Sequence, residues 1–69
     1  MKLSDMQPGE VGTVQFIWGG TKVTGQLGEL GIEPDCKLSV TAKAGGHVIV
    51  GLGHRRFALS DDVASKIIL

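Results

Sequence analysis

The sequence predicts a small all-β barrel of five short strands, with one short helical insertion and a short helical turn near the C-terminus. Two features carry this prediction. The chain has 11 glycines in 69 residues, about twice the usual share, and they separate short runs rich in β-branched residues. Within several runs apolar and polar residues alternate, as on a strand with one buried face. Strands this short bury a common face only by curling into a barrel.

The first predicted strand covers residues 11–18 and follows a bend. Pro8 and Gly9 favour that bend, because proline fixes φ at the first central position of a turn and glycine accepts a positive φ at the second. Apolar residues then recur at every second position, and we expect this set to face the core: Val14, Phe16 and Trp18. Gly19 and Gly20 end the strand.

The segment from Thr21 to Ile32 is predicted to be a helix. Its apolar residues are spaced by four and three positions: Val23, Leu27 and Leu30. Thr21 is the expected N-cap, and Gly31 is the expected residue after the last turn, where glycine accepts a left-handed conformation. Gly25 and Gly28 each weaken a helix by about 1 kcal/mol relative to alanine, so this helix depends on tertiary packing.

Four further strands and a helical turn are predicted beyond this helix. The strands cover residues 37–43, 47–52, 55–59 and 67–69. Along the first of them the residues expected to face inward are Leu38, Val40 and Ala42. Gly45 and Gly46 suit a hairpin connection. Ser60 is the expected N-cap of the helical turn, with Asp61 and Asp62 in its first turn, where carboxylates favour the helix dipole.

Composition and charge limit the classes of function. Lys plus Arg number 7 and Asp plus Glu number 7, whereas a duplex-binding protein normally has a clear basic excess. No apolar run approaches the roughly 20 residues that span a bilayer, and no signal-peptide pattern follows Lys2. A lone Cys36 without an export signal predicts that the protein is located in the reducing cytoplasm.

The length allows one domain, residues 1–69.

The polar residues form no catalytic or metal-binding pattern. His47, His54 and Cys36 are the only soft ligand candidates, and their spacing fits no zinc motif, so we expect no metal and no cofactor. No nucleophile is accompanied by an orienting group and an oxyanion site, so we expect no catalytic residue and no enzyme. For Arg55 and Arg56 a solvated charge pair is favoured over a nucleic-acid site, because few aromatic residues are present for base stacking.

The order of several short motifs is informative. The motifs are Leu3 to Glu10, Gly19-Gly20, Leu27-x-x-Leu30-Gly31-Ile32-x-Pro34, Val48-Ile49-Val50, Phe57-Ala58-Leu59 and Ala64-x-x-Ile67. This order resembles the FeoA-domain family, the small cytoplasmic component of the bacterial ferrous-iron uptake system, over nearly the whole chain. Gln26, Asp35 and Ser60 stand where that family commonly has Arg, Gly and a basic residue.

The resemblance implies an SH3-like barrel with a helical insertion, and no catalytic activity. It also implies an accessory role in ferrous-iron uptake through contact with FeoB, a membrane permease whose cytoplasmic part is a GTP-binding domain. Such a protein would be cytoplasmic and would reach the inner membrane through its partner, without inserting into it or binding nucleic acid. The alternative is a stand-alone metal-responsive or nucleic-acid-binding regulatory module, because the same domain occurs at the C-terminus of iron-dependent repressors.

The segment from Trp18 to Leu30 is the predicted partner-binding region, and self-association remains a second possible interaction. Trp18 is the only tryptophan, and tryptophan is enriched among interface anchors. An alternative interpretation gives Trp18 a purely structural role, as a plug in one end of the barrel. The residues predicted to bind the partner are Trp18, Gly19, Gly20, Thr24, Gln26 and Glu29.

Overall fold

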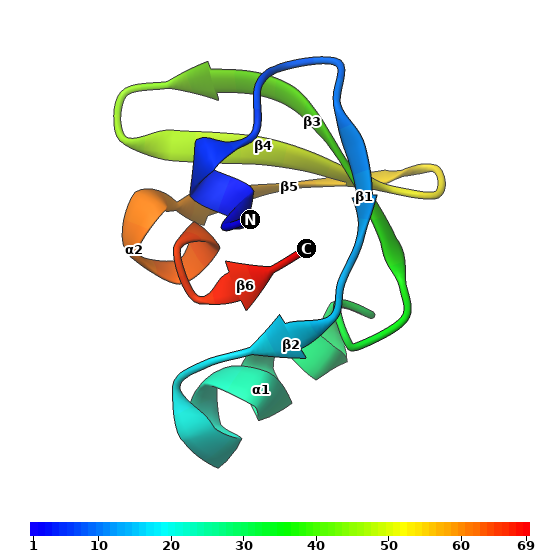
Figure 1. Ribbon diagram of the computed structural model, residues 1–69, viewed down its shortest axis with the longest axis vertical. Helices are drawn as coiled ribbons and strands as arrows, with labels where there is room; N and C mark the ends of the chain where they lie inside the picture. The colour runs from blue at the N-terminus through cyan, green and yellow to red at the C-terminus, as the bar shows by residue number, and fades with distance from the viewer.

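A computed structural model describes residues 1–69. Its elements are η1 (Leu3–Asp5), β1 (Val11–Thr13), β2 (Phe16–Ile17), α1 (Gly20–Glu29), β3 (Lys37–Ala44), β4 (His47–Leu52), β5 (Arg55–Ser60), α2 (Asp61–Ala64) and β6 (Ile67–Ile68). An antiparallel four-stranded sheet has the order β1-β3-β4-β5, and β2 pairs with β6 in a second sheet. Figure 1 shows the larger sheet curving over β6, with α1 beyond β2. The mostly β fold class is confirmed.

The single strand predicted for residues 11–18 is wrong, because the chain changes partners in its middle. Val14 donates its N–H to the carbonyl of Cys36 at 2.8 Å and accepts from the N–H of Asp35 at 2.7 Å. These bonds hold Val14 just before the start of β3, after which the chain crosses to β6. The result is six strands where five were expected.

The two tight hairpins follow the glycines. Gly45 and Gly46 both have positive φ, +58° and +79°, as a type I′ turn requires, and they connect β3 directly to β4. Gly53, at φ +62°, opens the equally short connection from β4 to β5. The register of β3 shifts between Val40 and Ala42, a bulge that leaves Ala42 exposed. The expectation that Ala42 faces inward is therefore wrong.

The helix α1 ends as predicted and begins differently. Gly31, at φ +89°, donates to the carbonyl of Gly28, and Ile32 donates to the carbonyl of Leu27, which together form a Schellman cap. The N-cap is Gly19 and not the expected Thr21, and no side chain caps this end. At α2 the predicted cap is confirmed, since Ser60 Oγ accepts from the N–H of Val63 at 3.3 Å.

The core is entirely apolar and lies between the two sheets, closed at one end by η1 and α2. No polar or charged side chain is buried in it. Its members are Leu3, Met6, Val14, Ile17, Leu27, Ile32, Leu38, Val40, Val48, Val50, Leu59, Ala64 and Ile67. The three aromatic side chains are absent from this set, although Phe57 packs against it. Neither helix has the length and apolar character needed to cross a bilayer.

Candidate partner-binding surface

Two aromatic rings, one on β2 and one directly after it, project on the same side. Phe16 and Trp18 are separated by one residue, so their side chains leave the strand in the same direction. Their ring centroids are 4.8 Å apart with an interplanar angle of 81°, an edge-to-face pair. Ile17, between them, points the other way and is buried. The strand thus uses one apolar residue for the core and presents two to solvent.

Both rings are exposed, which corrects the expectation that they belong to the core. Trp18 is 59% exposed and Phe16 is 49% exposed. The alternation from Val14 to Trp18 does not describe one face, because the backbone changes strand partner after Val14. The interpretation of Trp18 as a plug in one end of the barrel is wrong, because more than half of its side chain is exposed to water. Sequence reasoning missed Phe16 as a surface residue.

The backbone around the pair is firmly held. Gln15 donates to the carbonyl of Ile68, and Trp18 donates to the carbonyl of Lys66, both at 2.8 Å. Gly19 follows at φ +109°, and Gly20 at φ +72° starts α1. A Cβ at Gly19 would lie 2.8 Å from Val23 Cγ2, closer than atoms pack. Glycine is therefore required at position 19 by both conformation and space, and this turn fixes α1 beside the aromatic pair.

Replacing Gly19 with alanine is expected to lower the free energy of unfolding by about 1–3 kcal/mol, the cost of a strained backbone conformation, with the clash against Val23 in addition. Urea unfolding of the purified variant measures this. Gly25→Ala is the matched control, because Gly25 lies inside α1 with nothing within 4 Å of an added Cβ. That variant should instead gain up to about 1 kcal/mol. Equal stability of both variants would contradict this account of the turn.

The helix α1 turns one side toward the barrel and leaves the other in water. Leu27 is buried, and Val23 and Leu30 are half-buried. Gln26 and Glu29, three positions apart, are neighbours on the exposed side. The hydroxyl of Thr24 donates to the carbonyl of Gly20 at 2.9 Å, within the helix itself. All six residues predicted to bind a partner are exposed, and together with Phe16 they form what we call the aromatic surface: Phe16, Trp18, Gly19, Gly20, Thr24, Gln26 and Glu29.

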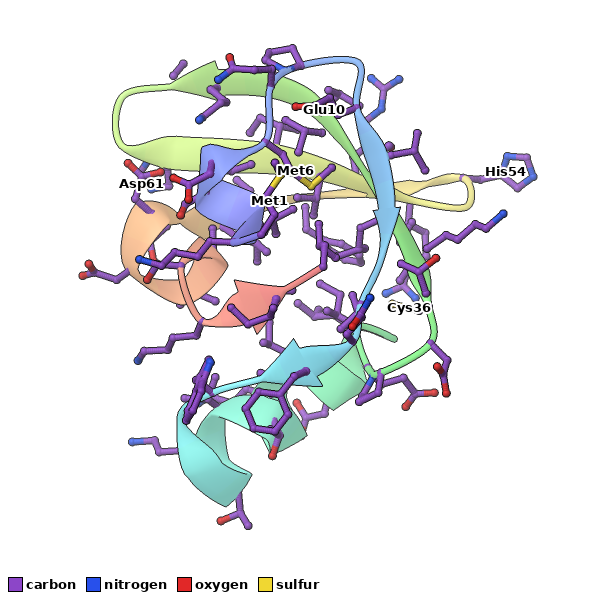
Figure 2. The ribbon with its side chains drawn as sticks, in the orientation of Figure 1. Met1, Met6, Glu10, Cys36, His54 and Asp61 are labelled. Carbon is purple, nitrogen blue, oxygen red and sulfur yellow. The ribbon has the colours of Figure 1, made fainter.

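The three soft ligand candidates lie apart. His54 is at the tip of the β4–β5 turn, and Cys36 lies just before β3, well away from it (Figure 2). His47 begins β4, and its Nδ1 lies 3.1 Å from the carbonyl oxygen of Gly45. No group of three His, Cys, Asp or Glu side chains comes together, and no pocket opens on the surface. Arg55 stacks on the Phe57 ring at 4.9 Å from its centroid.

Comparison with known families decides the relationship. A family model described as the FeoA domain matches residues 1–69, the whole of the sequence. The chain belongs to the FeoA family. The FeoA family is linked to ferrous-iron transport as an accessory and is not a known enzyme family.

Solved structures agree with this membership. A crystal structure of an iron uptake regulatory protein, FeoA, is 29% identical, with a TM-score of 0.90 over 97% of this chain and 91% of that one. The solution structure of FeoA from Chlorobium tepidum is 26% identical, with a TM-score of 0.89 over 99% of this chain and 67% of that one. No curated protein sequence gives a significant match.

Two more distant likenesses concern the fold alone. FeoA from Stenotrophomonas maltophilia, solved with zinc and described as an SH3 domain protein, is 24% identical, with a TM-score of 0.84 over 99% of this chain and 87% of that one. The SH3-like barrel is thereby confirmed. A manganese-dependent transcriptional repressor is 24% identical, with a TM-score of 0.87 over 97% of this chain but 39% of its own. The FeoA fold thus also occurs as part of a longer regulatory protein.

Proposed function

We propose that this protein is an accessory of ferrous-iron uptake that binds the cytoplasmic GTP-binding domain of an FeoB-type permease through the aromatic surface. Membership of the FeoA family supports the transport role. The observation that supports the place of contact is the edge-to-face pair of Phe16 and Trp18, exposed by 49% and 59%. In this role the protein works on the cytoplasmic side of the membrane and does not enter the bilayer.

The exposed aromatic pair has the properties of an interface centre. Exposed apolar side chains that lie in contact with one another, unlike single ones, mark sites of contact with other molecules. Tryptophan buries a large area on binding while few torsions have to be fixed. Gln26 and Glu29 are exposed polar residues of α1, the helix that follows the pair, and we assign them to the polar rim that surrounds such a centre.

The backbone that carries the aromatic pair is also held by the barrel itself. The hydrogen bond from Trp18 to Lys66 fixes the backbone, and the Phe16 ring limits the motion of the indole. A pre-organised surface loses less conformational freedom on binding, so more of the contact energy remains as affinity. Such a domain acts on a permease by binding its conformations with unequal affinity, which shifts the population of the more tightly bound one.

The test measures, by calorimetry, direct binding of this protein to the purified GTP-binding domain of the permease. The variant Gln26→Lys with Glu29→Lys adds one positive charge and reverses one negative charge on the exposed side of α1, and it leaves the core untouched. We expect it to weaken binding by about tenfold or more, because lysine is unfavourable in a contact that excludes water and the change alters the charge complementarity of the surface, with an unchanged melting temperature.

The matched control is Asp5→Lys with Gln7→Lys. It makes the same change of charge at two exposed residues near η1, on the far side of the barrel from α1. This control should bind as the unaltered protein does. Equal affinity of both double variants would show that α1 lies outside the interface, and no binding by the unaltered protein would refute the proposed partner.

The likeness to a manganese-dependent repressor supports a second candidate, a regulatory module that responds to metal or nucleic acid. The two candidate functions differ in the ligand that the isolated protein binds. Binding of duplex DNA or of Mn²⁺ or Fe²⁺ by this protein, without the permease domain, would favour this function. Iron uptake restored to a deletion strain only by variants that keep permease binding would favour the first.

A further inference from the structure

The strand β5 is an open edge of the four-stranded sheet. It pairs with β4 and has no neighbour on its other side. The N–H of Asp61 donates to the carbonyl of Gly46 at 2.9 Å. In an antiparallel pair, hydrogen-bonded and non-hydrogen-bonded residue pairs alternate, so this bond shows which β5 residues are bonded to β4. By that alternation the backbone groups of Leu59 and Phe57 face β4, whereas those of Arg56 and Ala58 and the N–H of Ser60 face away. The carbonyl of Ser60, the N-cap of α2, accepts a bond within that helix. No other backbone hydrogen bond uses Arg56 or Ala58.

The protection of this edge against strand pairing is confined to one end, where the charged Arg55 and Arg56 stand. Natural edges are kept short or are blocked by charged side chains, proline or bulges. The other edge of the sheet, β1, has only three residues. The strand β5 has six residues, Arg55–Ser60, with an unbroken register along β4 and no proline or lysine. At its middle is Ala58, a small and exposed residue that lets another backbone approach closely.

The charges at the two ends of β5 are opposite. Arg55 and Arg56 stand at its start, and Asp61 and Asp62 follow its end; all four side chains are exposed. Figure 2 shows the two ends, marked by His54 and Asp61, on opposite sides of the molecule. The strand is too long for these charges to pair within one chain, since six residues extend roughly 20 Å. An edge that is basic at one end and acidic at the other is complementary to an antiparallel copy of itself.

We propose that two copies of this protein pair through their β5 edges, antiparallel, about a two-fold axis at Ala58. In this register Ala58 exchanges both hydrogen bonds with its equivalent, and the N–H of Ser60 donates to the carbonyl of Arg56 of the other copy. Arg55 then stands opposite Asp61 of the other copy, twice by symmetry. The two sheets join into one continuous sheet, and the dimer is independent of the aromatic surface, which has no residue on β5.

Pairing in this register also buries apolar surface of β5. Phe57 and Leu59 lie on one side of β5, and Phe57 is only half-buried in the single chain. In the dimer Phe57 of each copy stands across from Leu59 of the other, so burial of the Phe57 ring contributes along with the hydrogen bonds and charges. The opposite side of the strand carries Arg56 and Ala58, which stay in water, and Ser60, whose hydroxyl remains bonded to the N–H of Val63.

Sedimentation equilibrium of the unaltered protein from about 10 µM to about 1 mM tests the proposal, with ¹H exchange of the Ala58 amide as a local readout. We expect a monomer–dimer equilibrium and slower exchange of that amide at high concentration, because in the single chain it has no acceptor. A monomer throughout the range, or exchange at Ala58 that does not depend on concentration, would overturn the proposal.

Charge exchange tests the register. Arg55→Glu alone and Asp61→Lys alone should each weaken the dimer about tenfold, because each places like charges opposite one another. The two changes together in one chain restore opposite charges and should restore the dimer. Lys37→Glu, an exposed reversal on β3, is the control and should leave it unchanged. A dimer that survives each single change, or that the combined change does not restore, would refute this pairing.

Discussion

Replacing Leu38 with alanine is expected to lower the free energy of unfolding by about 2–5 kcal/mol, which is the range for buried leucines. Leu38 is fully buried on β3, opposite Gly12 of β1, and its side chain is part of the only core the domain has. A chain of this length has a total stability of about 3–10 kcal/mol. Urea unfolding at 25 °C should therefore show a variant close to the limit of folding.

Val11→Ala is the matched control for this experiment. Val11 also lies in the β1–β3 pair, but its side chain is 66% exposed, so its truncation leaves no cavity. Its free energy of unfolding should change by about 0.5 kcal/mol or less. If Leu38→Ala were as stable as Val11→Ala, the packing described for the barrel interior would be wrong.

Replacing Trp18 with alanine is expected to weaken binding of the permease domain by about 30-fold or more, a loss of about 2 kcal/mol or more that is typical of a central interface residue. The variant removes the larger ring of the exposed pair and leaves Phe16 without its edge-to-face neighbour. Because Trp18 is exposed, the free energy of unfolding should change little. Calorimetry of binding and urea unfolding of the same preparation separate the two effects.

The control is again Val11, an exposed apolar residue. It lies on β1 in the four-stranded sheet, whereas the aromatic pair belongs to the β2–β6 pair. Val11→Ala should bind as the unaltered protein does. Full affinity of Trp18→Ala would move the interface away from the aromatic surface, whereas a loss of both affinity and stability would assign Trp18 a structural role.

Much of the fold could be predicted from the sequence because it is controlled locally. Gly45 and Gly46 predict a hairpin, and both adopt the positive φ that this turn requires. Gly31 predicts the end of α1, where a side chain would oppose the left-handed conformation. Ser60 predicts the start of α2 by its capping hydroxyl. In each case a residue's own chemistry determines the backbone within a few positions.

The surface was harder to predict because distant pairing controls it. The alternation of Val14, Phe16 and Trp18 suggests one buried face, and only the bonds of Val14 to residues 35 and 36 show that the strand breaks there. No local signal marks this change of partner. The bulge in β3 that exposes Ala42 arises in the same way, from register against β4. Of the surface residues, Trp18 could be proposed from its type, whereas Phe16 required the structure.

The pairing of β2 with β6 has a consequence for biosynthesis. The strand that carries Phe16 and Trp18 finds its hydrogen-bonding partners only at Lys66, Ile67 and Ile68, near the other end of the sequence. Contacts between such remote segments form late in folding, because a long loop must close first. A nascent chain still lacking those residues has no strand against which to orient the two rings. The aromatic surface is therefore assembled only once β6 has been translated, and a product that stops before β6 would not present it.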